Sequence, residues 1–297
     1  MRILIFGANS FIGRNFIYYL KEKKDVYVEL YDYQDIQFDN VKGYCRFNPL
    51  DKNEWKRLDL NCDLIYFFVG MTGTEKSIVN YDGFIDVNEK SLLHLLTECK
   101  EQASKAKIVF PSSRLIYKGK KTPIKENDEK EAKTIYATNK LSCENYLKLF
   151  NNIFGINYCT LRICVPFGSL INNVSSYGTA EFFVNKAASG QDLTLYGSGE
   201  IKRTFTYIGD LCEILWAVGI NNNCLNDAYN VGGCTLSLKR LAEMVSQKYK
   251  VKTVTIDYPD FAKKIESGDT VFDSSKLDFI INQTEYYSIL DWLNSTK

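Results

Sequence analysis

The chain has 297 residues, and its 37 Lys and Arg residues against 36 Asp and Glu residues give a formal net charge of +1. This balance argues against a polybasic nucleic-acid-binding protein and against an acidic disordered tail. Hydrophobic residues make up 45% of the chain, and no apolar run approaches the roughly 20 residues that span a bilayer. The first residues show no signal-peptide cleavage site, and the nine cysteines are scattered, so we expect a cytoplasmic protein without a membrane partner.

The chain opens with a predicted βαβ unit. Residues 3–6 form a short apolar run that ends at Gly7, which is typical of a buried parallel strand. An apolar residue then recurs every four positions over residues 12–20, the stripe of an amphipathic helix. A second strand is predicted at residues 26–31 and leads directly to Asp32.

The turn between the first strand and the helix is a candidate dinucleotide site. It reads Gly7-Ala8-Asn9-Ser10-Phe11-Ile12-Gly13. Glycine permits positive φ angles and close packing, and free amides at a helix N-terminus can cradle a pyrophosphate. A carboxylate at Asp32 can accept hydrogen bonds from an adenosine ribose and would repel a 2′-phosphate, which favours NAD over NADP.

The same rhythm continues along the chain. Further apolar runs lie at 64–70, 108–110 and 158–163, and helical patterns at 89–104 and 136–151 separate them. Such alternation predicts an α/β fold with a Rossmann-type, doubly wound parallel sheet.

The two halves of the chain differ in pattern. The sheet and its helices are expected in residues 1–165, as a dinucleotide-binding domain. Residues 166–297 are richer in glycine turns, with helices predicted near 180–189, 236–250 and 285–294. We interpret this part as a smaller mixed α/β lobe for substrate, of which some late segments return to the sheet.

A tyrosine and a lysine form the candidate catalytic pair. Tyr136 and Lys140 are four residues apart, about 6 Å along a helix, and share one face. A lysine ammonium beside the tyrosine is expected to lower the phenol pKa, so that Tyr136 can exchange a proton with a substrate hydroxyl. Ser112 and Ser113 follow the strand at 108–110, at the sheet edge where ligands bind.

Together these motifs resemble the extended short-chain dehydrogenase/reductase family, in its sugar-nucleotide epimerase/dehydratase branch. The resemblance runs through nearly the whole chain. It implies that Ser113, Tyr136 and Lys140 are catalytic, and that NAD is the cofactor. The cofactor-binding residues implied, besides Tyr136 and Lys140, are Gly7, Asn9, Ser10, Phe11, Ile12, Gly13, Asp32, Asn48 and Asp51. The segment Val87-Asn88-Glu89 matches the start of the helix after the fourth strand.

The C-terminal half carries the implied substrate contacts. The segment that begins Arg203-Thr204-Phe205 resembles one whose arginine contacts the substrate's diphosphate. Lys263 or Lys264, upstream of Gly268-Asp269, stands where a second phosphate-binding arginine often occurs in the family. Ser112 and Ser113 complete the implied substrate set, and the implied partner is a nucleotide-diphosphate sugar.

Two departures narrow the chemistry. Arg114 and Leu115 stand where the 4,6-dehydratases carry an acidic pair, so dehydration is disfavoured. Val165 stands where the family usually has an asparagine. We therefore favour hydride transfer at C4 of the sugar, with epimerisation first. A nucleotide-sugar dehydrogenase or an NAD(P)-dependent 4-ketoreductase is the alternative, and a non-catalytic dinucleotide-binding protein is a weaker one. No metal is expected, and the family's habit implies a homodimer through the helices at 89–104 and 136–151.

Overall fold

Strands and helices alternate through the first half of the molecule. The structure is a computed structural model, and it describes residues 1–172, 174, 176 and 178–296. In chain order its first elements are β1 (Arg2–Phe6), α1 (Phe11–Leu20), β2 (Tyr27–Asp32), β3 (Tyr44–Arg46), α2 (Lys52–Lys56), β4 (Leu64–Phe67), α3 (Thr74–Val79), α4 (Tyr81–Ile85), the π-helical turn η1 (Asp86–Lys90), α5 (Ser91–Glu101), β5 (Lys107–Ser113), the 3-10 turn η2 (Arg114–Ile116), α6 (Ile135–Phe154) and β6 (Tyr158–Ile163).

The second half mixes shorter strands with helices. Its elements are β7 (Val165–Phe167), α7 (Thr179–Ala188), β8 (Leu193–Tyr196), β9 (Lys202–Tyr207), α8 (Ile208–Ile220), β10 (Asp227–Asn230), β11 (Cys234–Ser237), α9 (Leu238–Tyr249), β12 (Thr253–Ile256), α10 (Asp260–Ile265), α11 (Ser275–Ile281) and α12 (Ile289–Ser295). None of the described helices is both long enough and apolar enough to cross a membrane.

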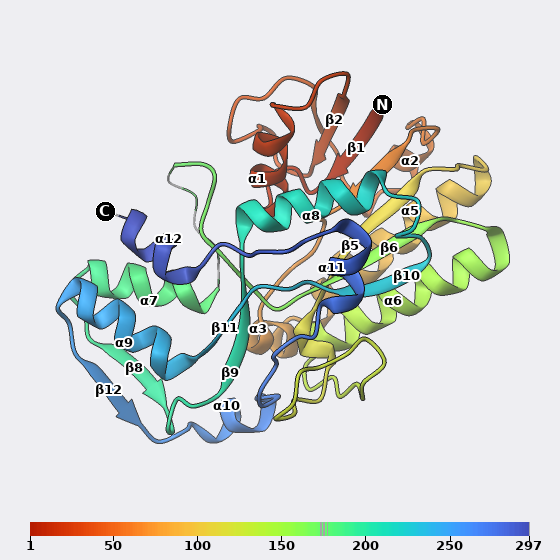
Figure 1. The fold of residues 1–297 in the computed structure, drawn as a ribbon. Helices are drawn as coiled ribbons and strands as arrows, with labels where there is room; N and C mark the ends of the chain where they lie inside the picture. The colour runs from red at the N-terminus through yellow and green to blue at the C-terminus, as the bar shows by residue number, and fades with distance from the viewer. Residues whose placement is uncertain (173, 175, 177, 297) are drawn as a thin grey trace.

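A seven-stranded sheet forms the centre of the fold. Its strand order is β10-β6-β5-β4-β1-β2-β3, and every neighbouring pair is parallel. The order reverses direction between β1 and β4, where the chain switches from one side of the first strand to the other. The predicted α/β class with a doubly wound parallel sheet is thus confirmed (Figure 1).

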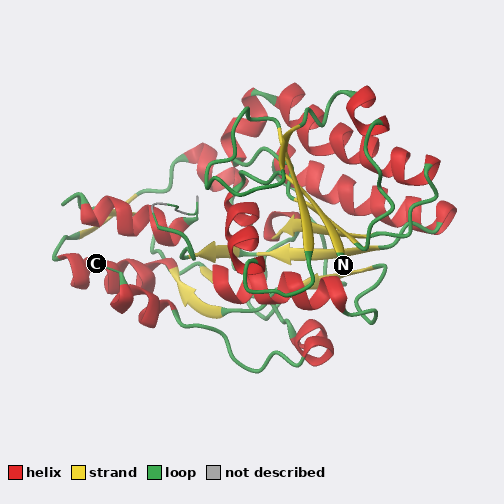
Figure 2. Ribbon diagram, turned by 90° about the horizontal axis from the view of Figure 1, so that it is seen from above, coloured by secondary structure: helices red, strands yellow, loops and turns green. Residues whose placement is uncertain are grey.

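Helices cover both faces of this sheet (Figure 2). Alternate residues of a strand point to opposite faces. In β1, Ile3 and Ile5 pack into a core cluster with α1 and α8, while Leu4 and Phe6 pack into a cluster with α2, α5 and α6. Because both of their faces are buried, β1 and β4 are apolar along nearly their whole length, which explains why they appear in the sequence as continuous apolar runs.

A smaller lobe gathers at one end of the molecule, where α7, α9 and α12 lie beside β8 and β12 (Figure 1). It holds a three-stranded sheet, β11-β9-β7, and a parallel pair, β12-β8. The division near residue 165 is not a clean cut, because α8 packs on the large sheet and β10 adds its last strand. Late segments of the chain therefore return to the large sheet.

Candidate active site

The glycine turn closes tightly on the sheet. Gly7 has a φ angle of +80°, and a Cβ atom there would lie 2.6 Å from the carbonyl carbon of Phe68, after β4. A Cβ on Gly13 would overlap the carbonyl oxygen of Gly7. Both positions therefore require glycine, because either side chain would push the turn away from β4 or from the first turn of α1.

Ser10 is the N-cap of α1. Its Oγ accepts a hydrogen bond from the Gly13 N–H at 3.0 Å, which satisfies one of the free amides of the first turn. In the described part of the chain, no acceptor meets the backbone N–H groups of Phe11 and Ile12, the first two residues of the helix. These two amides remain available for an anion at the positive end of α1, so the turn fits the pyrophosphate of a dinucleotide.

Asp32 lies beside this turn, at the end of β2. Its carboxylate accepts a hydrogen bond from the Asn9 N–H at 2.9 Å, and the side chain is only 8% exposed. The Asn9 side chain points elsewhere and binds the loop after β2, with Nδ2 donating to the Ile36 carbonyl at 2.9 Å and Oδ1 accepting from the Phe38 N–H at 3.1 Å. The structure thus places Asp32 and the glycine turn together, as the NAD prediction requires.

Two further predicted cofactor residues are used locally. Asn48 is exposed after β3, and its side chain accepts a hydrogen bond from the Leu50 N–H at 3.1 Å. Asp51 is the N-cap of α2 and accepts a hydrogen bond from the Asn53 N–H at 2.8 Å. For Asp51 the structure therefore shows a capping role, and its contact with the adenine stays a prediction.

The predicted catalytic residues meet between β5 and α6. Thr134 caps α6 by accepting a hydrogen bond from the Ala137 N–H, which places Tyr136 in the first turn and Lys140 one turn later. Ser113 ends β5, and its hydroxyl lies close enough to Tyr136 to lower the pKa of the phenol, while its Oγ accepts a hydrogen bond from the Leu115 N–H at 3.2 Å. Ser113 is distant in the sequence from Tyr136 and Lys140, which are one helical turn apart on α6. The three residues thus form one cluster at the carboxyl edge of the sheet.

The electrostatics of this cluster differ from our expectation. Burial raises the pKa of Tyr136, while the nearby Ser113 hydroxyl and the charge of Arg114 act in the opposite direction. Lys140 is 7% exposed; its Nζ donates to the Pro111 carbonyl at 2.7 Å and lies 4.5 Å from the Phe110 ring centroid. Burial lowers its pKa to about 8. The effect of Lys140 on the Tyr136 pKa therefore stays a prediction, and Arg114 is the cation whose charge opposes the effect of burial here.

Asn88 supports the same site from η1. It is buried, and its Oδ1 accepts a hydrogen bond from the Met71 N–H at 2.7 Å while Nδ2 donates to the Met71 carbonyl at 3.2 Å. This pair of bonds holds the chain just after β4. A Cβ on Gly70 would lie 3.9 Å from the Lys140 Nζ, so the segment that follows β4 lies next to the lysine ammonium.

Ser112 does not reach the site. Along a strand, it faces the same side of the sheet as Phe110, the side covered by α6. It is 5% exposed, and its hydroxyl donates to Glu144 Oε1 at 2.5 Å. The prediction that Ser112 binds substrate is corrected accordingly: strand alternation turns its side chain behind the strand, whereas Ser113 lies at the strand end.

A buried ion pair that the sequence reasoning missed holds Ser112 in this place. Arg162 of β6 donates to both carboxylate oxygens of Glu144, with Nη2 to Oε2 at 2.6 Å, and its Nη1 donates to the Tyr117 hydroxyl at 2.6 Å. Tyr117 in turn donates to Asn230 Oδ1 of β10 at 2.7 Å. The network joins α6, β6 and β10 directly behind the reacting residues.

Arg203 of β9 is buried and already paired. Its side chain is 3% exposed, and Nη2 lies 2.5 Å from the Glu266 carboxylate, while Nη1 donates to the backbone carbonyls of Lys202 and Gly268. Its assignment to a substrate diphosphate stays a prediction, and it requires that Glu266 release part of the guanidinium. Lys264 is exposed on α10, so the side chain of this segment that meets Arg203 is Glu266.

Arg114 completes this part of the site. It begins η2, directly after Ser113, and its Nη1 donates to the hydroxyls of Ser267 at 3.2 Å and Thr270 at 3.5 Å. Burial and the charge of Arg203 lower its pKa to about 10. Two guanidinium groups thus converge from η2 and β9 on the segment of residues 266–270.

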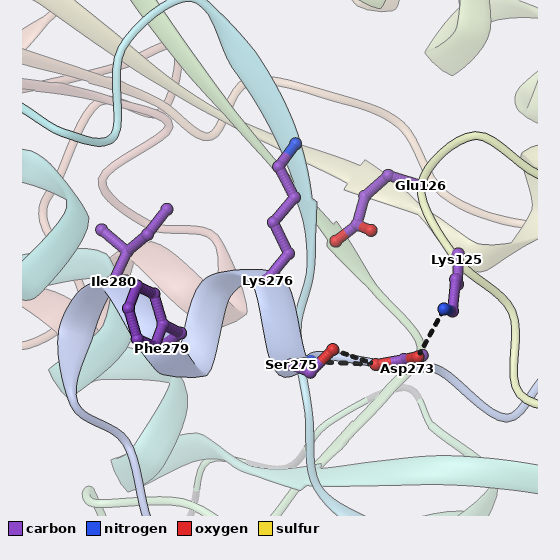
Figure 3. Close-up of a pocket in the computed structure, with 7 residues that line it drawn as sticks. All are labelled: Lys125, Glu126, Asp273, Ser275, Lys276, Phe279 and Ile280. Carbon is purple, nitrogen blue, oxygen red and sulfur yellow. Dashed lines mark hydrogen bonds and ion pairs between the residues drawn. The ribbon is translucent and has the colours of Figure 1, made fainter.

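Two negative observations complete the description. Within the described residues, no group of three or more His, Cys, Asp or Glu side chains could hold a metal ion. A separate pocket lies between α11 and the loop at Lys125 and Glu126, and its lining residues do not include the predicted catalytic ones (Figure 3).

Comparisons with known proteins agree with this geometry. The model of the NAD dependent epimerase/dehydratase family matches residues 3–232. A protein of Methanocaldococcus jannaschii named putative UDP-glucose 4-epimerase is 26% identical over 83% of this chain and 82% of its own length.

Solved structures share the fold. The X-ray structure of Pal from Bacillus thuringiensis superposes with a TM-score of 0.89 at 21% identity and covers 100% of this chain and 97% of its own. The UDP-glucuronic acid 4-epimerase of Bacillus cereus, solved with UDP-glucuronic acid and NAD, has a TM-score of 0.87 at 20% identity and covers 99% of this chain and 97% of its own.

Proposed function

Because the chain belongs to the NAD dependent epimerase/dehydratase family, we propose that it inverts the C4 hydroxyl of a nucleotide-diphosphate sugar. The observation that carries the proposal is the proximity of Ser113 and Tyr136, at the sheet edge to which the glycine turn and Asp32 also belong. NAD, when bound, supplies the acceptor and donor of hydride for the step between alcohol and ketone.

The proton is handled by the chain. The hydroxyls of Ser113 and Tyr136 converge, so an alcohol oxygen placed between them can pass its proton to the phenolate oxygen of Tyr136. Arg114 and the Ser113 hydroxyl stabilise that phenolate. After the ketone has turned its other face, the same phenol returns the proton, and the net change is the configuration at one carbon.

The dehydratase alternative receives no support from the site. Elimination of water needs an acid and a base next to the reacting serine or threonine, and the resembled dehydratases carry an acidic pair there. In this chain Arg114 and Leu115 follow Ser113 instead. A guanidinium with a pKa of about 10 stays charged at neutral pH and is a poor general base.

The test is incubation with a panel of nucleotide sugars, followed by chromatography and mass spectrometry of the products. A product of unchanged mass but inverted configuration, without net NADH, supports the epimerase. Net NADH formation with a product two mass units lighter indicates the dehydrogenase, and consumption of NADH by a 4-keto sugar indicates the ketoreductase.

One variant ties the activity to Tyr136. Tyr136→Phe removes the proton-exchanging hydroxyl and is expected to reduce turnover by about 100-fold or more while NAD still binds. Tyr146→Phe is the matched control, because this tyrosine lies on the same helix and donates to Glu89 instead. Equal turnover of the Tyr136→Phe variant and the wild type would remove the tyrosine from the mechanism.

We propose in addition a cytoplasmic homodimer built on α5 and α6. In support, Leu149 and Ile153 lie four residues apart on α6 and are 49% and 60% exposed, although both are large and apolar.

A further inference from the structure

Arg114 stands next to the reacting group. It follows Ser113 in the chain, and the Ser113 hydroxyl lies close to Tyr136. The positive charge of Arg114 acts to lower the pKa of the Tyr136 phenol, against the larger effect of burial. The side chains of Arg114 and Tyr136 are both largely buried, but neither is fully shielded from solvent. A ligand oxygen that reaches Tyr136 therefore comes close to the Arg114 guanidinium.

No protein carboxylate forms a direct ion pair with this guanidinium, and the charge of Glu266 reaches it only from a longer distance. Within the described residues, no carboxylate oxygen lies within 4.0 Å of Arg114, and its hydrogen-bond partners are the neutral hydroxyls of Ser267 and Thr270. The nearby acid, Glu266, is taken by Arg203 at 2.5 Å and also accepts from the Tyr258 hydroxyl at 3.0 Å.

The other acid of this segment is committed as well. Asp269 accepts from the Lys202 N–H at 3.0 Å and pairs with Lys121 at 3.3 Å. Two guanidinium groups, those of Arg114 and Arg203, thus share one carboxylate, and one positive charge in a largely buried place is left without an anion. Such a charge is costly to bury unless a partner of opposite charge is supplied.

We propose that this partner is a carboxylate on the reacting sugar, so that the substrate is a nucleotide-linked uronic acid bound through Arg114. This inference rests on the proposed function. The carboxylate of a uronic acid is attached to C5, the ring carbon next to C4, and therefore lies within a few bonds of the oxygen that meets Tyr136. A planar guanidinium suits a carboxylate because it can donate two parallel hydrogen bonds to it.

The diphosphate of the substrate is the other anion that could reach Arg114. It is separated from C4 by the width of the sugar ring, whereas Arg114 adjoins Ser113 and Tyr136, which meet the C4 oxygen. The relatives do not decide between neutral and acidic sugars, because those compared include proteins named for UDP-glucose and for UDP-glucuronic acid.

The experiment compares three ligands by titration calorimetry on the NAD-loaded protein: UDP-glucuronic acid, UDP-glucose and UDP, with the thymidine set run in parallel. The wild type is expected to bind the uronic acid about tenfold or more tightly than the neutral sugar. Arg114→Gln, which keeps a polar planar side chain, is expected to bring the ratio of the two Kd values close to 1. Arg114→Lys should retain part of the preference.

The matched control is Lys121→Gln. It removes one positive charge from the other side of the same segment, where Lys121 pairs with Asp269 and its side chain is 91% exposed. The preference for the uronic acid should survive in this variant, because a screened surface charge contributes little.

Two results would overturn the inference. One is a wild type that binds both sugars equally well, and the other is an Arg114→Gln variant that binds all three ligands more weakly by the same factor, since that pattern assigns the arginine to the diphosphate. Because the comparison of Kd values needs no identification of a product, a failure of the epimerase proposal shows only in the product assay. Conversely, epimerisation of the neutral sugar without any preference contradicts the uronic-acid inference alone.

Discussion

Ser10 occupies the middle of the glycine turn, a position that glycine holds in the family pattern that the sequence resembles. A hydroxyl fits there because it caps α1 through the Gly13 N–H. Gly7 and Gly13 could not be replaced in the same way, since a side chain on either meets backbone atoms. The turn therefore keeps its two obligatory glycines and uses the third position to stabilise the helix N-terminus, which leaves the amides of Phe11 and Ile12 free.

Asp32 is expected to set the preference for NAD over NADP. Replacing its carboxylate removes the repulsion of a 2′-phosphate, so Asp32→Ala should raise the relative affinity for NADP by about tenfold or more. Asp32→Asn separates charge from structure, because an amide oxygen can still accept from the Asn9 N–H. Fluorescence titration with both cofactors gives the ratio.

The control for that experiment is Asp35→Ala, which removes an 88% exposed carboxylate from the same loop. Its cofactor ratio should equal that of the wild type. An unaltered ratio in both Asp32 variants would refute the ribose contact.

Lys140 makes stability depend on pH in a predictable direction. Its pKa is about 8 in the folded protein against an ordinary 10.5, so between these values the unfolded chain binds more protons and the free energy of unfolding rises with pH. The cost of burying the ammonium is therefore full below pH 8 and is relieved as the pH approaches 10.5. In Lys140→Met this cost is absent at every pH.

Urea unfolding of cofactor-free wild type and Lys140→Met at pH 7.5 and at pH 10 tests this. From pH 7.5 to pH 10, the free energy of unfolding of the wild type should rise relative to that of the variant by on the order of 2 kcal/mol. A difference that stays constant with pH would show that Lys140 titrates normally.

The sequence could predict the local half of the site. Tyr136 and Lys140 share one helix, and the glycine turn and Asp32 belong to one βαβ unit, so their spacing alone brings them together. Glu266 could not be predicted, because its contact with Arg203 depends on how two distant segments of the smaller lobe meet. Ser112 was assigned to the substrate site because it is adjacent to Ser113 in the sequence. Neighbouring side chains of β5 face opposite sides of the sheet, and Ser112 contacts Glu144 instead.

Elements with a strong apolar pattern were predicted well, and weakly patterned ones were not. The five inner strands β1, β2, β4, β5 and β6 and helix α6 lie where the apolar runs and the helical period place them, whereas the edge strands β3 and β10 were not predicted. The last helix was expected at 285–294 and begins only at Ile289, because Tyr286 and Tyr287 precede the cap at Ser288 and bind Asp278 and Asp210 instead. The parallel pair β12-β8 gave no signal, since its strands are short.

Lys107, on strand β5, caps the C-terminal end of helix α8. The lysine is 5% exposed at the start of β5, and its Nζ donates to the carbonyls of Val218, Gly219 and Asn221 at 2.7–3.0 Å. Lys107→Met keeps the apolar stem but leaves three carbonyls without this donor. We expect the free energy of unfolding to fall by roughly 1–3 kcal/mol.

Urea denaturation measures that loss, with Lys105→Met as the control, because Lys105 is exposed two residues earlier. The control should stay within about 0.5 kcal/mol of the wild type. A Lys107→Met variant as stable as the control would mean that water replaces the ammonium at the helix end.

At the scale of the whole molecule, α6 is expected to join two copies of the chain. Ile153→Lys places a charge in the proposed interface and should convert a dimer into a monomer, because a buried unpaired charge costs far more than an exposed one. Static light scattering reports the mass directly.

The matched control is Phe279→Lys, which replaces another exposed apolar side chain, 85% exposed on α11, away from α6. It should leave the mass unchanged. A wild type that scatters as a monomer of 34.1 kDa at micromolar concentration would exclude the dimer altogether.

The strand order also bears on how the protein is made. β6 pairs with β10, and β10 consists of residues 227–230, which leave the ribosome long after β6 has been synthesised. At about 5–20 residues per second, the edge of β6 stays uncovered for several seconds while β7, β8 and β9 emerge. An uncovered strand edge can pair with another chain. During this interval each nascent chain is therefore prone to aggregate through β6, and chaperones or a low concentration of other nascent chains would prevent it.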